Sequence, residues 1–307
     1  MERTDHMIEV EPLTRSKLPA PLLKRILEKR EFLRHSLDAE ALSLIGDDGY
    51  RAPDEHVLDD AIVSMALGKN VLLKGPTGSG KTRLAETLSY LFGQPMHAVN
   101  CSVDLDAEGL IGFKTLEVEL GQSAVRFVPG PVVKAMTLGH WLYIDEINMA
   151  KPETLPLING VLDHRRTITN PFTGEIIRAK EGFGVIAAVN IGYVGTVPMN
   201  EALKNRFVVV DVPYLQGDKL LELLKEKARF TNGSVLERFV RLSSDLQEQI
   251  RSGQLSDEAA SVRALIDACD LAAYIPTLRA VQRAIADKLD DEREKALVMN
   301  LAETYFD

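Results

Sequence analysis

The sequence offers little that could cross-link the chain, export it or anchor it in a membrane. It contains only two cysteines, Cys101 and Cys269, too far apart in the sequence to suggest the disulfide framework of a small secreted fold. No apolar run approaches the roughly 18 residues expected of a membrane-spanning helix. Residues 1–6 also lack the apolar stretch of a signal peptide. We therefore expect a protein of the reducing cytoplasm with no membrane span.

Basic residues are also scarce relative to acidic ones. The 36 Lys and Arg residues stand against 45 Asp and Glu residues, which gives a formal net charge of −9. Non-specific binding to nucleic acid depends on many Lys and Arg contacts to phosphates, so we expect no nucleic-acid partner. Apolar residues make up 45% of the 307 residues, which is ordinary for a folded protein and sufficient for a core.

Hydrophobic patterning divides the chain into three parts. Residues 1–51 show no strand pattern and are expected to form an N-terminal helical arm. Residues 52–215 alternate apolar runs with helical patterns, which predicts an α/β nucleotide-binding domain with buried parallel strands. Residues 216–307 show only amphipathic helical patterns, which predicts an α-helical lid domain. The expected strands lie at residues 71–73, 96–99, 141–144, 185–189 and 207–212.

A phosphate-binding loop follows the first expected strand. Its sequence, GPTGSGKT, matches the pattern G-x-x-x-x-G-K-[ST]. Glycines let the backbone N–H groups turn toward phosphate oxygens, and the following helix presents its N-terminus to the same anion. Lys81 is expected to reach the β- and γ-phosphates of ATP, and the Thr82 hydroxyl to bind Mg²⁺. The predicted nucleotide-binding residues are Gly75, Pro76, Thr77, Gly78, Ser79, Gly80, Lys81 and Thr82.

Two carboxylates follow the apolar run at residues 141–144. On its own, an acidic pair such as Asp145 and Glu146 commonly begins a solvated loop. A phosphate loop in the same domain changes that expectation, because phosphoryl transfer needs a group for the metal and a group for the attacking water. We therefore expect Asp145 to hold Mg²⁺ and Glu146 to orient and polarise the water.

Residues from about 52 to 214 resemble the AAA+ ATPases, and more narrowly the MoxR family and its CbbQ/NirQ/NorQ-type group. The resemblance implies a P-loop NTPase (AAA+) parallel sheet domain followed by a small all-α lid domain. It also implies a helix-2 insert at residues 105–128 and a pre-sensor-1 hairpin at residues 167–178. The motifs that carry it are GPTGSGKT at 75–82, LIG at 110–112, FVPGP at 127–131, IDEIN at 144–148 and NRF at 205–207.

Three further site residues are implied by the resemblance. Asn190 matches sensor 1, which contacts the γ-phosphate or the water, although alone it would be an ordinary turn residue. Arg206 matches the arginine finger, which neutralises transition-state charge on the neighbouring subunit's nucleotide. Arg263 matches sensor 2, and Arg279 is the alternative for that position. Without the resemblance, all three arginines would be ordinary surface residues.

The resemblance implies Mg²⁺-dependent ATP hydrolysis by a ring, expected to be a homohexamer. Such ATPases remodel or activate a client protein complex, for example a metalloenzyme, together with a partner that carries a von Willebrand factor A domain. Two alternatives remain open. A DNA-translocating AAA+ motor is disfavoured by the charge of −9, and a P-loop kinase of a small molecule would need an acceptor pocket and an arginine-rich lid.

The second insertion suggests a contact surface. Its turn contains Pro171 and Phe172, and an apolar tip is unusual for a passive hairpin. We expect Phe172 to be exposed and to contact a client or partner. In the alternative, Phe172 folds back onto its own hairpin.

Overall fold

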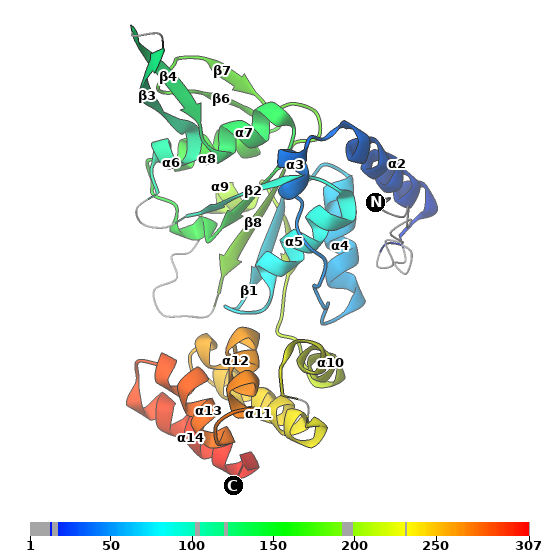
Figure 1. Ribbon diagram of the computed structural model, residues 1–307, viewed down its shortest axis with the longest axis vertical. Helices are drawn as coiled ribbons and strands as arrows, with labels where there is room; N and C mark the ends of the chain where they lie inside the picture. Colours follow the sequence, from blue (N-terminus) through cyan, green and yellow to red (C-terminus); the bar gives the residue numbers. More distant parts are fainter. Residues whose placement is uncertain are drawn as a thin grey trace.

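A five-stranded parallel sheet forms the centre of the larger part of the molecule (Figure 1). The computed structural model describes residues 13, 18–101, 105–119, 122–191, 199–230 and 232–306. The sheet order is β2-β5-β8-β1-β9, and each neighbouring pair is parallel. All five strands lie at the predicted apolar runs, which confirms the α/β prediction. The strands are β1 (Val71–Gly75), β2 (Met96–Asn100), β5 (Trp141–Asp145), β8 (Gly184–Asn190) and β9 (Val208–Asp211).

Helices cover both faces of this sheet and create two cores. Alternate side chains of a strand point to opposite faces, so Leu72 joins one core while Val71 and Leu73 join the other. The first core includes α7 (Pro131–Leu138) and α8 (Leu155–Leu162). The second includes α4 (Glu55–Ala66) and α5 (Lys81–Phe92). Helix α5 ends where Gly93 takes φ +60°, the left-handed conformation that glycine adopts readily at a C-cap.

The N-terminal helices pack onto the second core. Helix α2 (Ala20–Ser36) lies within the predicted N-terminal arm and contacts α4 and α5. Its Ile26 is buried in the same core as those helices, and its Arg30 donates a hydrogen bond to the Leu91 carbonyl at 2.9 Å. A short helix, α3 (Ala39–Ser43), follows. The arm is therefore part of the packing of the α/β domain.

Two hairpins project from the end of the molecule that lies away from the C-terminal helices (Figure 1). The first follows α6 (Ala107–Ile111) and consists of β3 (Gly112–Glu119) and β4 (Gln122–Pro129). The second consists of β6 (Thr167–Thr169) and β7 (Ile176–Arg178). Both hairpins lie where the sequence predicts insertions.

Phe172 does not project from its hairpin, so the predicted exposed tip is wrong. The ring is half-buried, packs against the core beneath α7 and α8, and stacks on Phe127 of β4 with centroids 6.5 Å apart. The Phe172 N–H donates to Asn170 Oδ1 at 2.9 Å, which curls the turn back. The gain from burying an aromatic ring explains why it folds inward. The two insertions consequently touch each other.

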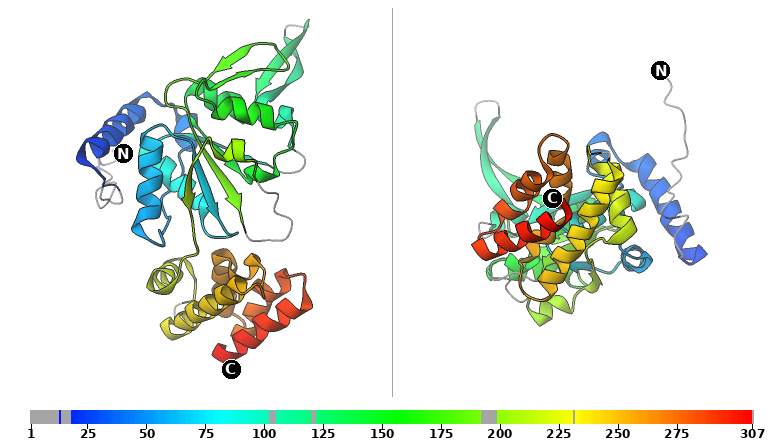
Figure 2. Two further views of the ribbon diagram at one scale, coloured as in Figure 1. Left: turned by 180° about the vertical axis from the view of Figure 1, so that it is seen from behind. Right: turned by 90° about the horizontal axis from the view of Figure 1, so that it is seen from below.

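The C-terminal helices have a hydrophobic core of their own and form a separate layer (Figure 2, yellow to red). No strand follows Asp211 in the part of the chain that the structure describes. The described residues contain no helix with the length and apolar character to cross a membrane. The helices are α9 (Glu201–Lys204) before β9, and then α10 (Gly217–Lys227), α11 (Gly233–Arg251), α12 (Val262–Ala272), α13 (Thr277–Ala284) and α14 (Glu292–Phe306).

Candidate active site

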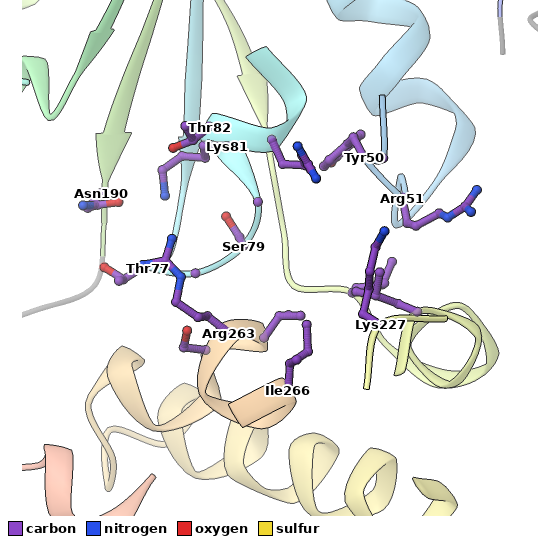
Figure 3. Close-up of a pocket in the computed structure, with 18 of the residues that line it drawn as sticks. Tyr50, Arg51, Thr77, Ser79, Lys81, Thr82, Asn190, Lys227, Arg263 and Ile266 are labelled. Carbon is purple, nitrogen blue, oxygen red and sulfur yellow. The ribbon is translucent and has the colours of Figure 1, made fainter. Parts of the chain in front are cut away.

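A cavity of about 600 Å³ lies at the carboxyl edge of the sheet, between the sheet and helices α10 and α12 (Figure 3). Parallel strands bring their carboxyl ends to one edge, where ligands of such sheets bind. Residues 77–82 line the cavity, whereas Gly75 and Pro76 are not among its lining residues. Asp145, Glu146 and Asn190 line it from the ends of β5 and β8. The structure thus brings together the residues predicted for phosphate, metal and water.

The phosphate loop takes the backbone conformation that its glycines allow. Gly78 has φ +76° and Gly80 has φ +94°, both in the left-handed region that other residues rarely adopt. Gly80 is the N-cap of α5, so the N–H groups at the start of that helix face the cavity. Such a helix start favours a bound anion.

Lys81 is held against the loop by the loop's own carbonyls. Its Nζ donates to Gly75 O at 2.9 Å and to Pro76 O at 2.7 Å, and the side chain is only 6% exposed. Burial lowers the pKa of Lys81 to about 8, although the nearby carboxylates of Asp145, Glu146 and Asp257 raise it. The ammonium is therefore mostly protonated at neutral pH and available to phosphate.

Thr82 and Asp145 fit a magnesium ion. Thr82 Oγ1 lies 3.5 Å from Asp145 Oδ2 and 3.1 Å from the Tyr143 hydroxyl. Hydroxyl and carboxylate oxygens are ligands that Mg²⁺ prefers, with phosphate and water oxygens completing its octahedron. No group of three or more His, Cys, Asp or Glu residues suited to a metal occurs among the described residues. With Thr82 and Asp145 as its protein ligands, the metal would be held chiefly by oxygens of the nucleotide and of water.

Glu146 has an unusual backbone conformation for a residue with a side chain. Its φ is +51° and its ψ is 42°, in the left-handed region. Such residues cost roughly 1–3 kcal/mol and gather at functional sites. The Asn190 Nδ2 donates to Glu146 Oε1 at 3.1 Å, which directs the carboxylate toward the end of β8. Asn190 pairs in register with Gly75, so it also lies next to the phosphate loop.

The structure separates the predicted arginines. Arg263 lines the cavity and points from α12 toward the phosphate loop (Figure 3), whereas Arg279 is not among the lining residues. Arg206 lies near the start of β9, and the start of β9 pairs with the start of β1. The phosphate loop follows the end of β1, so Arg206 and the loop lie at opposite edges of the sheet. The Arg206 guanidinium donates to the Ala202 carbonyl. A single chain therefore does not bring Arg206 to its own cavity.

The sequence analysis missed one end of the cavity. Figure 3 shows Asn190 at one end and Arg51 and Lys227 at the other. Arg51 NH2 lies 2.7 Å from Glu226 Oε2, and this ion pair joins the segment before α4 to helix α10. No local motif marks these residues, because they meet only after the chain folds. Further lining residues that no motif marks include Gly49, Tyr50, Leu215, Leu223 and Ile266.

Comparisons with known proteins agree with this geometry. Residues 70–207 match the family model described as the AAA domain (dynein-related subfamily). Residues 70–207 therefore form an AAA domain of this family. The uncharacterized protein YojN of Bacillus subtilis is 60% identical over 307 residues, which is 100% of both chains. An uncharacterized protein of Staphylococcus saprophyticus is 58% identical over 254 residues, covering 82% of this chain and 97% of the relative.

Solved AAA+ structures resemble the chain only distantly. A variant of Thermotoga maritima RuvB is 17% identical with a TM-score of 0.49, covering 80% of this chain and 75% of its own. NtrX of Brucella abortus in complex with ADP is 18% identical with a TM-score of 0.47, covering 83% of this chain and 58% of its own.

Proposed function

We propose that this AAA+ ATPase hydrolyses ATP with Mg²⁺ as cofactor and uses the cycle to remodel or activate a client protein complex. The observation that carries the proposal is the convergence of five polar side chains from the phosphate loop and two adjacent strands at one cavity. These residues are Lys81, Thr82, Asp145, Glu146 and Asn190.

Each of these residues has a separate task in the proposed reaction. The loop N–H groups and Lys81 bind the β- and γ-phosphates, and Thr82 and Asp145 hold the metal. Mg²⁺, when bound, supplies positive charge to the phosphate oxygens. Glu146 accepts the proton of the attacking water, and Asn190 keeps that carboxylate aligned through its 3.1 Å hydrogen bond.

Two arginines complete the proposed site from different chains. Arg263 reaches the nucleotide from α12 of the same chain, as its position in the cavity supports. Arg206 lies near the start of β9, away from the phosphate loop, so it would reach a nucleotide only in a neighbouring copy. We therefore propose a ring in which each copy completes its neighbour's site, with a homohexamer as the expected size.

The proposed conformational change during ATP hydrolysis is a rotation between the α/β domain (residues 52–215) and the helical lid domain (residues 216–307). Both line the cavity, and the helices have a separate core, which supports treating them as a unit. The chain's resemblance to MoxR-type ATPases suggests a partner with a von Willebrand factor A domain and a metalloenzyme client in the cytoplasm. The exposed Phe113, Leu116 and Val125 of the β3–β4 hairpin support a protein contact there.

Calorimetric titration and phosphate release test the proposal. The purified full chain should bind ATP and ADP more tightly with Mg²⁺ than with excess chelator, and should release phosphate from ATP only with Mg²⁺. Addition of double-stranded DNA at several salt concentrations should leave turnover unchanged. Failure to bind either nucleotide would overturn the proposal.

A further inference from the structure

The connector between the sheet and the helical lid runs along the back of the phosphate loop. A Cβ placed on Gly75 would overlap the Val212 carbonyl oxygen, and one placed on Gly78 would overlap Ser261 Oγ. Val212 begins the connector to α10, and Ser261 is the N-cap of α12. The loop is thus in close contact with the connector at Gly75 and with the lid at Gly78.

One hydroxyl joins these three elements. Tyr214, in the connector, donates to Thr77 O of the phosphate loop at 3.0 Å and to Asp257 O of the lid at 2.7 Å. Asp257 begins the 3₁₀ turn Asp257–Ala260, which leads into α12. A tyrosine hydroxyl has a single proton, so the two carbonyls share it. Burial raises the pKa of Tyr214, so the hydroxyl remains a donor throughout the neutral range.

The contact to Thr77 O fixes the direction of a neighbouring N–H group. In a planar trans peptide the C=O and the N–H point in opposite directions. Because the Thr77 carbonyl points to Tyr214, the Gly78 N–H of the same peptide points away from Tyr214. Thr77 and Gly78 both line the cavity, and Tyr214 is not among its lining residues. Glycine tolerates either orientation of the preceding peptide, so the loop sequence alone does not select one.

We propose that Tyr214 is a positioning residue that holds the Thr77–Gly78 peptide with its N–H toward the phosphates and ties that orientation to the lid through Asp257 O. The inference rests on the proposed nucleotide site. It adds a direct link between phosphate binding and lid position that passes through neither Arg263 nor Lys81. When phosphates hold the Gly78 N–H, the carbonyl of the same peptide stays fixed on Tyr214, and the connector loses freedom.

Tyr214→Phe removes the shared proton and keeps the ring. The expected result is a rise of roughly 3- to 10-fold in the Kd for Mg·ADP, the range that the net contribution of one hydrogen bond gives. In the nucleotide-free variant, amide hydrogen exchange should become faster in residues 77–81. The matched control is Tyr305→Phe, which removes a hydroxyl that donates to Asp245 Oδ2 at 2.6 Å within the helical part. The control should change neither the Kd nor exchange at residues 77–81.

The outcomes separate this inference from the proposed function. A wild-type chain that fails to bind Mg·ADP contradicts the nucleotide site itself. A wild type that binds, with Tyr214→Phe unchanged in both Kd and exchange, contradicts the role of Tyr214 alone. If Tyr214→Phe does not fold, amide hydrogen exchange in the wild-type chain tests the role of Tyr214 instead. Mg·ADP should slow exchange in connector residues 214–217, and unchanged exchange there would overturn the inference.

Discussion

The side-chain amide of Asn190 donates a hydrogen bond to the carboxylate of Glu146 across 3.1 Å, joining the ends of the adjacent strands β5 and β8. Glu146, which accepts this bond, has a strained backbone conformation with φ +51°. The strand pairing therefore sets the direction of the carboxylate that we assign to the attacking water.

Glu146→Gln should separate binding from turnover. The amide keeps the size and the contact to Asn190 but accepts no proton, so phosphate release should fall by at least about 10²-fold, the lower end of general-base contributions. Titration with Mg·ATP should give an affinity close to the wild type. Lys81→Ala is the opposite case and should lose tight ATP binding. Near-normal phosphate release by Glu146→Gln would remove Glu146 from its assigned role.

The buried ammonium of Lys81 should make the stability of the nucleotide-free chain depend on pH. Its pKa is lowered from 10.5 to about 8, so between these values the unfolded chain binds more protons than the folded chain. Stability then rises with pH through this window, by an amount on the order of 3 kcal/mol. Lys81→Met should remove that rise. Urea unfolding of both chains from pH 7 to 10.5 measures the difference, and parallel curves would contradict the lowered pKa.

The same group should take up a proton when nucleotide binds. Phosphate charge raises the pKa of an adjacent ammonium, so near pH 8.5 binding should draw protons from the buffer. Calorimetric titration with Mg·ADP in buffers of different ionisation enthalpy counts those protons. The wild type should show uptake that disappears near pH 6.5, where Lys81 is already protonated. Equal proton counts at both pH values would show that Lys81 does not titrate on binding.

Arg206 should act on a neighbouring copy. Arg206→Ala is expected to lower turnover by up to roughly 10³-fold, with little change in nucleotide affinity. Mixed with Lys81→Ala, it should regain partial activity, because an intact phosphate loop then meets an intact Arg206 across an interface. The control is each variant alone at the same total concentration. Subunits that exchange fully without recovering activity would contradict the assignment of Arg206 as an arginine finger.

Local patterns in the sequence predicted the strands, the phosphate loop and the acidic pair, because each depends on neighbouring residues. Contacts between distant segments were not predictable. Tyr214 and Thr77 meet across the connector, and Phe172 meets Phe127 across two insertions, with no periodicity to mark either pair. Arg263 lines the cavity and Arg279 does not, and this difference depends on the packing of α12 beside the loop, which no sequence pattern marks.

Phe172→Ala should lower stability and leave basal ATPase activity intact. The ring is half-buried and stacks on Phe127 at 6.5 Å, far from the cavity, so its loss should cost about 1–3 kcal/mol of unfolding free energy. Ile176→Ala is the matched control on the same hairpin, since Ile176 is 63% exposed and should cost little.

A double-mutant cycle with Phe127→Ala tests whether the two insertions support each other. The coupling energy should be about 0.5–1.5 kcal/mol, because the second substitution removes a stack that the first has already broken. Additive losses would mean that each ring packs on the shared core without support from the other ring. A coupled pair would mean that force on the β3–β4 hairpin reaches β6–β7 through this stack. From there it would pass directly to β8, which follows β7 in the chain and ends at Asn190.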